Sequence, residues 1–175
     1  MFIKPEEIVD KFGLMPSMAV ADFGSGSGYY TIAAARLVGP SGVVYSIDVQ
    51  KDVLAAVKST AELNHLSNIE IVWADLEKEK GSHLSSASVD FVVVSNILFQ
   101  AENRPAIAKE AFRILKERGK AAVIEWNKSK KGPGPVMEKR LPEEDTKKIF
   151  LAEGFLLDRN LPAGENHYGL LFKKQ

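Results

Sequence analysis

The sequence has no cysteine, no excess of either charge and no long apolar run in its 175 residues. The absence of cysteine excludes disulfides, thiolate zinc sites, iron–sulfur clusters and cysteine nucleophiles, and no metal site is predicted. No stretch approaches the ~20 apolar residues of a membrane span, and the residues after Met1 do not form a signal peptide. We therefore expect a soluble, cytoplasmic protein.

The balanced formal charge conceals an uneven distribution along the chain. Basic and acidic side chains each number 23, but residues 1–100 carry 7 basic and 12 acidic ones, whereas residues 101–175 carry 16 and 11. Such a division is typical either of separate binding surfaces or of ordinary scatter over solvated faces. The length and a hydrophobic content of 45% favour one globular domain spanning residues 1–175.

Apolar runs of strand length alternate with helical patterns over most of the chain. Because the runs are apolar on both faces, they predict an α/β fold with a mostly parallel sheet covered by helices on both sides. The pattern predicts strands at 18–23, 43–47, 69–73, 91–94 and 121–126, and helices at 5–12, 29–38, 51–64 and 104–117. A loop at 127–142, a helix at 142–152 and a hairpin of strands at 155–161 and 168–173 complete the chain.

A glycine-rich loop follows the first predicted strand and opens a helix. Gly24, Gly26 and Gly28 have the spacing G-x-G-x-G, which differs from the G-x-G-x-x-G of dinucleotide-binding proteins. No Lys-Ser/Thr pair follows, so the loop is not a P-loop either. Asp22, two positions before the first glycine, favours a cation or an amino group over a pyrophosphate. The alternative is a tight strand-to-helix turn without a ligand.

Two further carboxylates end the next two predicted strands. Asp48 follows the second strand, where an acidic side chain can accept both hydroxyls of a ribose. Asp75 follows the third strand, where a carboxylate can accept a hydrogen bond from an adenine amine. Taken alone, either residue is explained as well by a solvated turn or a helix N-cap. Together with Asp22 they lie at one edge of the predicted sheet, where ligands of open α/β sheets bind.

This set of motifs resembles the class I S-adenosylmethionine-dependent methyltransferases, nearest the ubiquinone/menaquinone biosynthesis branch. Residues 20–28 resemble the first motif of that family, 44–48 its acidic strand, 71–76 the adenine-side strand, 89–96 the substrate-facing strand and 115–126 the fifth-strand motif. The resemblance implies a Rossmann-like three-layer sandwich with a seven-stranded sheet of order 3-2-1-4-5-7-6, strand 7 being antiparallel. It also implies S-adenosyl-L-methionine as the cofactor.

The resemblance further implies a cofactor-binding role for eleven residues. Asp22 is expected to face the positive end of the methionine moiety. The other implied roles are a backbone cradle for methionine at Gly24, Ser25, Gly26 and Gly28, ribose binding at Asp48, packing beside adenine at Val49, adenine recognition at Asp75 and Leu76, and contact with methionine and acceptor at Ser95 and Asn96.

The chemistry expected of this family needs little from the protein beyond alignment. Methyl transfer is an in-line displacement at an activated sulfonium, and aligning two reactants can contribute roughly 7–11 kcal/mol. No catalytic residue is assigned, because His65 and His83 are explained by a helix end and the surface, and only His167 remains a candidate for substrate contact.

The acceptor is less clearly marked than the cofactor site. The absence of cysteine disfavours the pyrimidine-C5 and arsenite branches, and we expect a small-molecule acceptor. A basic loop follows the fifth strand, with Lys128, Lys130, Lys131, Lys139 and Arg140. It is either a solvated loop or a surface for an anionic acceptor such as RNA, or for a protein. A third reading is a non-catalytic S-adenosylmethionine-binding subunit, and the oligomeric state is left open.

Overall fold

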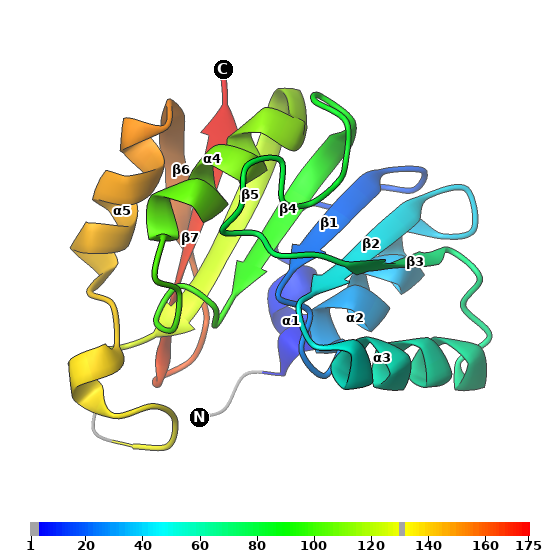
Figure 1. Ribbon diagram of the computed structural model, residues 1–175, viewed down its shortest axis with the longest axis horizontal. Coiled ribbons are helices and arrows are strands. Elements are labelled where there is room, and N and C mark those ends of the chain that lie inside the picture. The colour runs from blue at the N-terminus through cyan, green and yellow to red at the C-terminus, as the bar shows by residue number, and fades with distance from the viewer. Residues whose placement is uncertain (1–3, 130–131) are drawn as a thin grey trace.

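The computed structural model describes residues 4–129 and 132–175, and Figure 1 shows a central sheet flanked by helices. The strands are β1 (Ala19–Phe23), β2 (Val43–Asp48), β3 (Ile69–Trp73), β4 (Val89–Ser95), β5 (Leu115–Trp126), β6 (Phe155–Leu161) and β7 (His167–Lys174). The helices are α1 (Pro5–Val9), α2 (Tyr29–Val38), α3 (Lys51–Leu63), α4 (Arg104–Ile114) and α5 (Glu143–Ala152), with a 3-10 turn at Met137–Lys139.

The seven strands form one sheet in the order β3-β2-β1-β4-β5-β7-β6. The pairs from β3 to β5 are parallel, whereas β7 runs antiparallel to both β5 and β6. This confirms the predicted fold class and the predicted strand order. Successive strands are added on one side of β1 up to β3 and on its other side from β4 onward. The boundary between β1 and β4 is therefore the switch point at which open α/β sheets bind ligands.

Alternate side chains of the central strands pack into two hydrophobic cores, one on each face of the sheet. In β4, Val92 and Val94 point into the core shared with α4 and α5, whereas Phe91 and Val93 point into the core shared with α1 and α2. All four side chains are almost fully buried. Helix α3 lies along β2 and β3 (Figure 1). Double-sided burial explains why these strands are continuously apolar, and it makes the sheet a rigid support for the loops at its edge.

The boundary between α4 and β5 differs from the one predicted. The sequence pattern continues a helix to residue 117, but α4 ends at Ile114 and β5 begins at Leu115. Leu115 is fully buried, adopts an extended conformation and pairs with Val89 of β4. Gly119, expected to end the helix, lies inside β5 at an irregular stretch of the pairing. Burial of Leu115 against the sheet outweighs the helical preference of the charged residues that follow it.

The parallel strands place their carboxyl ends at one edge of the sheet. The glycine loop leaves β1 there, and the connections after β2, β3 and β4 begin beside it (Figure 1). No helix in the described part of the chain is both long and apolar enough to cross a bilayer.

Candidate functional site

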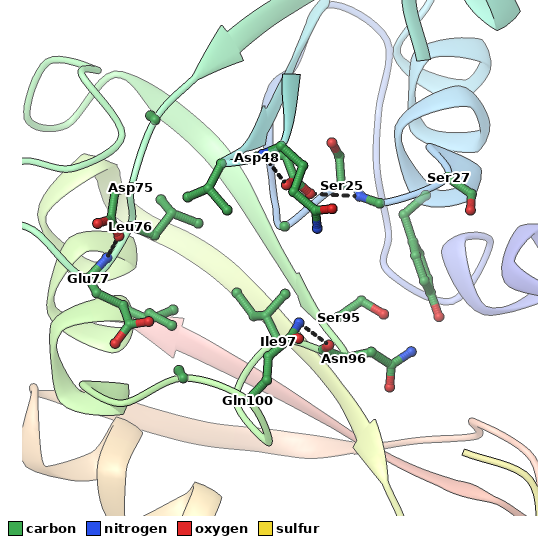
Figure 2. A pocket seen from close by; sticks show the side chains of 18 of the residues that line it. Ser25, Ser27, Asp48, Asp75, Leu76, Glu77, Ser95, Asn96, Ile97 and Gln100 are labelled. Carbon is green, nitrogen blue, oxygen red and sulfur yellow. Dashed lines mark hydrogen bonds between the residues drawn. The ribbon is translucent and has the colours of Figure 1, made fainter. Parts of the chain in front are cut away.

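A cavity of about 400 Å³ opens at the carboxyl edge, between the loops that follow β1 to β4. Figure 2 shows side chains from all four connections pointing into it. Nine of the eleven predicted cofactor-binding residues line this cavity: Gly24, Ser25, Gly26, Asp48, Val49, Asp75, Leu76, Ser95 and Asn96. The fold therefore brings residues that are as far as 72 positions apart in the sequence (24 to 96) into one wall.

Asp48 connects the end of β2 to the glycine loop. Its Oδ2 accepts a hydrogen bond from Gly26 N at 3.1 Å, and its Oδ1 accepts one from Gln50 N at 2.9 Å (Figure 2). The loop is also fastened through Gly24 N and Ser25 N, which both donate to the Ile47 carbonyl oxygen. Asp48 is only 7% exposed. Its two backbone N–H donors fix the orientation of its carboxylate in the cavity wall.

Gly24 allows a second connection to approach the glycine loop. Its φ of +69° lies in the left-handed region, and a Cβ at this position would collide with the Ile97 side chain from the β4–α4 connection. Both residues line the cavity. The close approach of two loops, rather than a turn alone, therefore requires glycine here.

Asp22 and Gly28 lie outside the lining of the cavity. Gly28 is the N-cap of α2 with φ +76°, and it packs against Val57 of α3. Asp22 is 1% exposed beneath the loop, where its Oδ2 accepts a hydrogen bond from Thr31 Oγ1 at 2.6 Å. Its Oδ1 is buried without a hydrogen-bond partner. Desolvation raises the pKa of Asp22 to about 6, although the bond from Thr31 opposes this effect.

The side of the cavity next to β3 is built from a short turn. Asp75 Oδ1 accepts a hydrogen bond from Glu77 N at 3.0 Å, and Leu76 between them is buried (Figure 2). The neighbouring Val49 is more than half exposed, and its carbonyl oxygen accepts a hydrogen bond from Trp73 Nε1. This side offers carboxylate oxygens beside an apolar surface, which suits a flat ring carrying an amino group.

The opposite side of the cavity follows the end of β4. Asn96 adopts φ +54°, and its Oδ1 is buried without a hydrogen-bond partner. The side chain of Ser95 faces the hydroxyl of Tyr30 from α2 and lowers the pKa of that phenol, against the larger effect of burial. Burial raises the pKa of Tyr30 to about 12, so its phenol stays protonated near neutrality. This side therefore offers neutral hydrogen-bonding groups.

Ten lining residues were not among the predicted cofactor-binding set. They are Ser27, Tyr29, Tyr30, Gln50, Ala74, Glu77, Ile97, Gln100, Ala101 and Ile107. Most lie in the connections after the strands, and their positions in the sequence directly follow the predicted strand ends. The acidic residues of the lining are Asp48, Asp75 and Glu77, and the described lining includes no Lys, Arg or His. The cavity therefore favours a ligand that carries positive charge.

The basic loop after β5 is folded around its arginine, Arg140. Arg140 is 2% exposed, and its guanidinium donates hydrogen bonds to the carbonyl oxygens of Asn127, Pro133 and Pro135 at 2.9–3.0 Å. Its charge is thus used inside the loop and does not face solvent. Lys128 and Lys139 are exposed, whereas Lys130 and Lys131 lie outside the described residues.

The switch-point cavity, the glycine loop and the strand-end carboxylates together define a Rossmann-like domain that binds a nucleoside-containing cofactor. A family model described as "Methyltransferase domain" matches residues 14–162, and the chain belongs to this family. The chain is similar to class I S-adenosylmethionine-dependent methyltransferases near the ubiquinone/menaquinone branch.

Curated relatives come from two branches of methyltransferases. Over 120 residues the chain is 24% identical to a demethylmenaquinone methyltransferase of a Geobacillus species, covering 69% of this chain and 50% of the relative. It is 28% identical to a ubiquinone/menaquinone biosynthesis C-methyltransferase of Pasteurella multocida, covering 69% and 44%. An arsenite methyltransferase of Halobacterium salinarum is 26% identical, covering 63% and 27%. The chain thus spans between a quarter and a half of the length of these relatives.

Solved structures confirm the architecture. A crystal structure of a SAM dependent methyltransferase from Aquifex aeolicus superposes with a TM-score of 0.90 at 26% identity, covering 99% of this chain and 91% of that one. The [4+2]-cyclase SpnF superposes with a TM-score of 0.81 at 16% identity, covering 97% and 79%. Because a cyclase shares the fold, the fold alone does not decide the reaction.

Proposed function

We propose that this chain transfers a methyl group from S-adenosylmethionine to a small-molecule acceptor. The observation that carries the proposal is Asp48, a carboxylate held at the end of β2 by two backbone N–H groups and facing a cavity that is lined by acidic side chains. A vicinal diol is recognised well by such a fixed carboxylate, because both of its hydroxyls donate to it.

The residues present fit the cofactor at both of its ends. The buried Asp22 Oδ1 lacks a partner and lies beneath the glycine loop, where it favours the positive charge of the methionine end. Asp75 and the Leu76 backbone would hold the adenine, and Val49 would pack against the ring. Gly24 and Gly26 place no side chain on the cavity wall, so the loop backbone can approach the cofactor closely. When bound, the cofactor supplies a methyl group already activated on a sulfonium.

The chain's own contribution to the reaction is alignment. Ser95 is the last residue of β4 and Asn96 follows it, so both are held by a strand that is paired on both sides. The protonated Tyr30 hydroxyl completes this side of the cavity. These neutral groups orient an acceptor without neutralising the sulfonium. Such alignment can supply about 7–11 kcal/mol of the barrier reduction.

The basic loop supports a small-molecule acceptor over RNA or protein, because its arginine is buried. Arg140 is enclosed by backbone carbonyls, so the loop presents fewer free cations than its composition predicts. The relatives whose names mention demethylmenaquinone and ubiquinone/menaquinone biosynthesis support an organic ring as acceptor. The relatives named for arsenite support it less, because this chain lacks cysteine.

Methyl transfer is tested with S-adenosylmethionine labelled on its methyl group. The purified chain is incubated with a short-chain demethylmenaquinol analogue and, separately, with total RNA. We expect label in the quinol and none in the RNA. Label in the RNA alone, lost when Lys128, Lys130 and Lys131 are changed to Ala, would overturn the small-molecule proposal. Cofactor binding without turnover on any acceptor would instead favour a subunit that needs a partner chain.

A further inference from the structure

Glu125, the penultimate residue of β5, is a fully buried carboxylate that the proposed reaction does not use. Its Oε1 accepts a hydrogen bond from Leu98 N at 2.7 Å, and its Oε2 accepts one from Trp126 N at 3.3 Å. The backbone N–H groups of Ile97 and Phe99 also lower the pKa of Glu125. The carboxylate therefore holds the β4–α4 connection through Leu98 and acts on the N–H groups on either side of it.

That connection forms one wall of the cofactor cavity. Ile97 contacts the glycine loop at Gly24, so closely that a Cβ there would collide with it. The Ile97 carbonyl oxygen then accepts hydrogen bonds from Gln100 N and Ala101 N. Ile97, Gln100 and Ala101 all line the cavity. Glu125 is therefore connected to the cavity wall by one short turn, to which it is hydrogen-bonded at Leu98.

Burial of this carboxylate is costly, which argues that its bonds to the turn are needed. Desolvation raises the pKa of Glu125 to about 7, while the backbone N–H groups of Leu98 and its neighbours oppose the rise. An apolar residue would fill the same position in β5 without that cost, as Val123 and Ala121 do on the same face of the strand.

We propose that Glu125 is a positioning residue, which holds the turn of Ile97 to Phe99 against the glycine loop and so sets the width of the cofactor cavity. The inference rests on the proposed binding of S-adenosylmethionine in that cavity. Without the carboxylate, the Leu98 N–H loses its acceptor and the wall moves away from Gly24. Glu125 acts through the turn and is not in the lining itself.

Glu110 of α4 provides a matched control. It is also a buried carboxylate (3% exposed), and its Oε1 accepts hydrogen bonds from Ser82 N and Ser82 Oγ. It pairs with Arg113 and lies away from the cofactor cavity. Glu110→Gln and Glu125→Gln are therefore the same chemical change at two buried sites, only one of which supports the cavity wall.

The test measures binding of S-adenosylhomocysteine by calorimetry to the wild type and to the Glu125→Gln, Glu125→Asp and Glu110→Gln variants. We expect Glu125→Gln to weaken binding about tenfold, because an amide NH₂ replaces one acceptor oxygen of a charged hydrogen-bonding group. Glu110→Gln should change the affinity by less than about twofold, even if its thermal midpoint falls. Glu125→Asp keeps the charge and should bind more tightly than Glu125→Gln.

Amide hydrogen exchange in the wild type gives a second measurement that needs no variant. The Leu98 amide should exchange slowly, as an N–H bonded to a buried carboxylate does, whether or not a ligand is present. Exchange of Leu98 at the rate of an exposed loop, or equal affinity of wild type and Glu125→Gln, would overturn the positioning role. Failure of the wild type to bind S-adenosylhomocysteine would overturn the proposed function instead, since the Leu98 amide reports on Glu125 independently of it.

Discussion

Gly26 N donates a hydrogen bond to Asp48 Oδ2 across 3.1 Å, and this bond joins the loop after β1 to the end of β2. The two residues are 22 positions apart in the sequence, and the register of the parallel strands brings them together. The same carboxylate orders the glycine loop and faces the cavity. Under the proposed function, cofactor binding and loop order are therefore coupled through the Asp48 side chain.

Gly24→Ala tests whether the two loops need their close approach. The new Cβ would collide with Ile97, in addition to the cost of about 1–2 kcal/mol for a left-handed non-glycine residue. We expect loss of cofactor binding and a lower free energy of unfolding, measured by calorimetry and urea titration. Gly13→Ala is the control, because Gly13 has φ +77° but open space around it. Equal effects of the two substitutions would mean that backbone strain alone explains the glycine.

Asp22 predicts a pH dependence of cofactor binding. Its pKa in the free protein is raised to about 6, and a cation bound nearby favours the charged form. Affinity for S-adenosylmethionine should therefore fall as the pH is lowered through about 6. Calorimetry at pH values on either side of this pKa should show the fall in the wild type and a smaller one in Asp22→Asn. If the affinity of Asp22→Asn fell as much with pH as that of the wild type, the assignment of Asp22 would be contradicted.

Asp22 also affects how the stability of the protein changes with pH, in the opposite sense to a carboxylate whose pKa is lowered by folding. The folded protein binds the proton of Asp22 more tightly than the unfolded chain, whose reference pKa is 3.8. The contribution of Asp22 to the free energy of unfolding is therefore greatest below pH ~4 and falls as the pH rises through about 6. Urea titrations over this range should show less loss of stability in Asp22→Asn than in the wild type.

Arg140 is predicted to stabilise the loop after β5 and to bind no acceptor. Arg140→Lys removes the planar fork that reaches the carbonyls of Asn127, Pro133 and Pro135. We expect the free energy of unfolding to fall by about 2–3 kcal/mol, with faster proteolysis in this loop. Lys139→Ala, at an exposed neighbour, should leave both unchanged. If Arg140→Lys keeps full stability but loses turnover, Arg140 binds the acceptor after all.

Much of the fold was predictable because double-sided burial leaves a clear mark on parallel strands. The runs at Val89–Ser95 and Ala19–Phe23 are almost wholly apolar, and the family resemblance supplied their order. The end of α4 was not predictable, because the residues after Leu115 favour a helix by composition, and only pairing with Val89 reveals the strand. Arg118, in the left-handed region at φ +63°, marks that irregular start.

The cofactor side of the cavity was also more predictable than the rest. Asp48 and Asp75 follow strand ends, and parallel strand ends must meet at one edge. Ile97 and Gln100 lie in a connection whose path no periodicity encodes, so their place in the cavity was missed. Glu125 did leave a signal, because it is the one carboxylate in the otherwise apolar run 121–126. Its partners are main-chain groups and have no sequence signature.

The central claim is that Asp48 binds the cofactor in this cavity, and calorimetry with S-adenosylmethionine tests it most directly. The wild type should bind, and Asp48→Ala should weaken binding about a hundredfold, because a charged acceptor of two hydroxyls is lost. Asp52→Ala, an exposed carboxylate in the first turn of α3, is the control and should bind as the wild type does. Equal affinity of Asp48→Ala and the wild type would contradict the account.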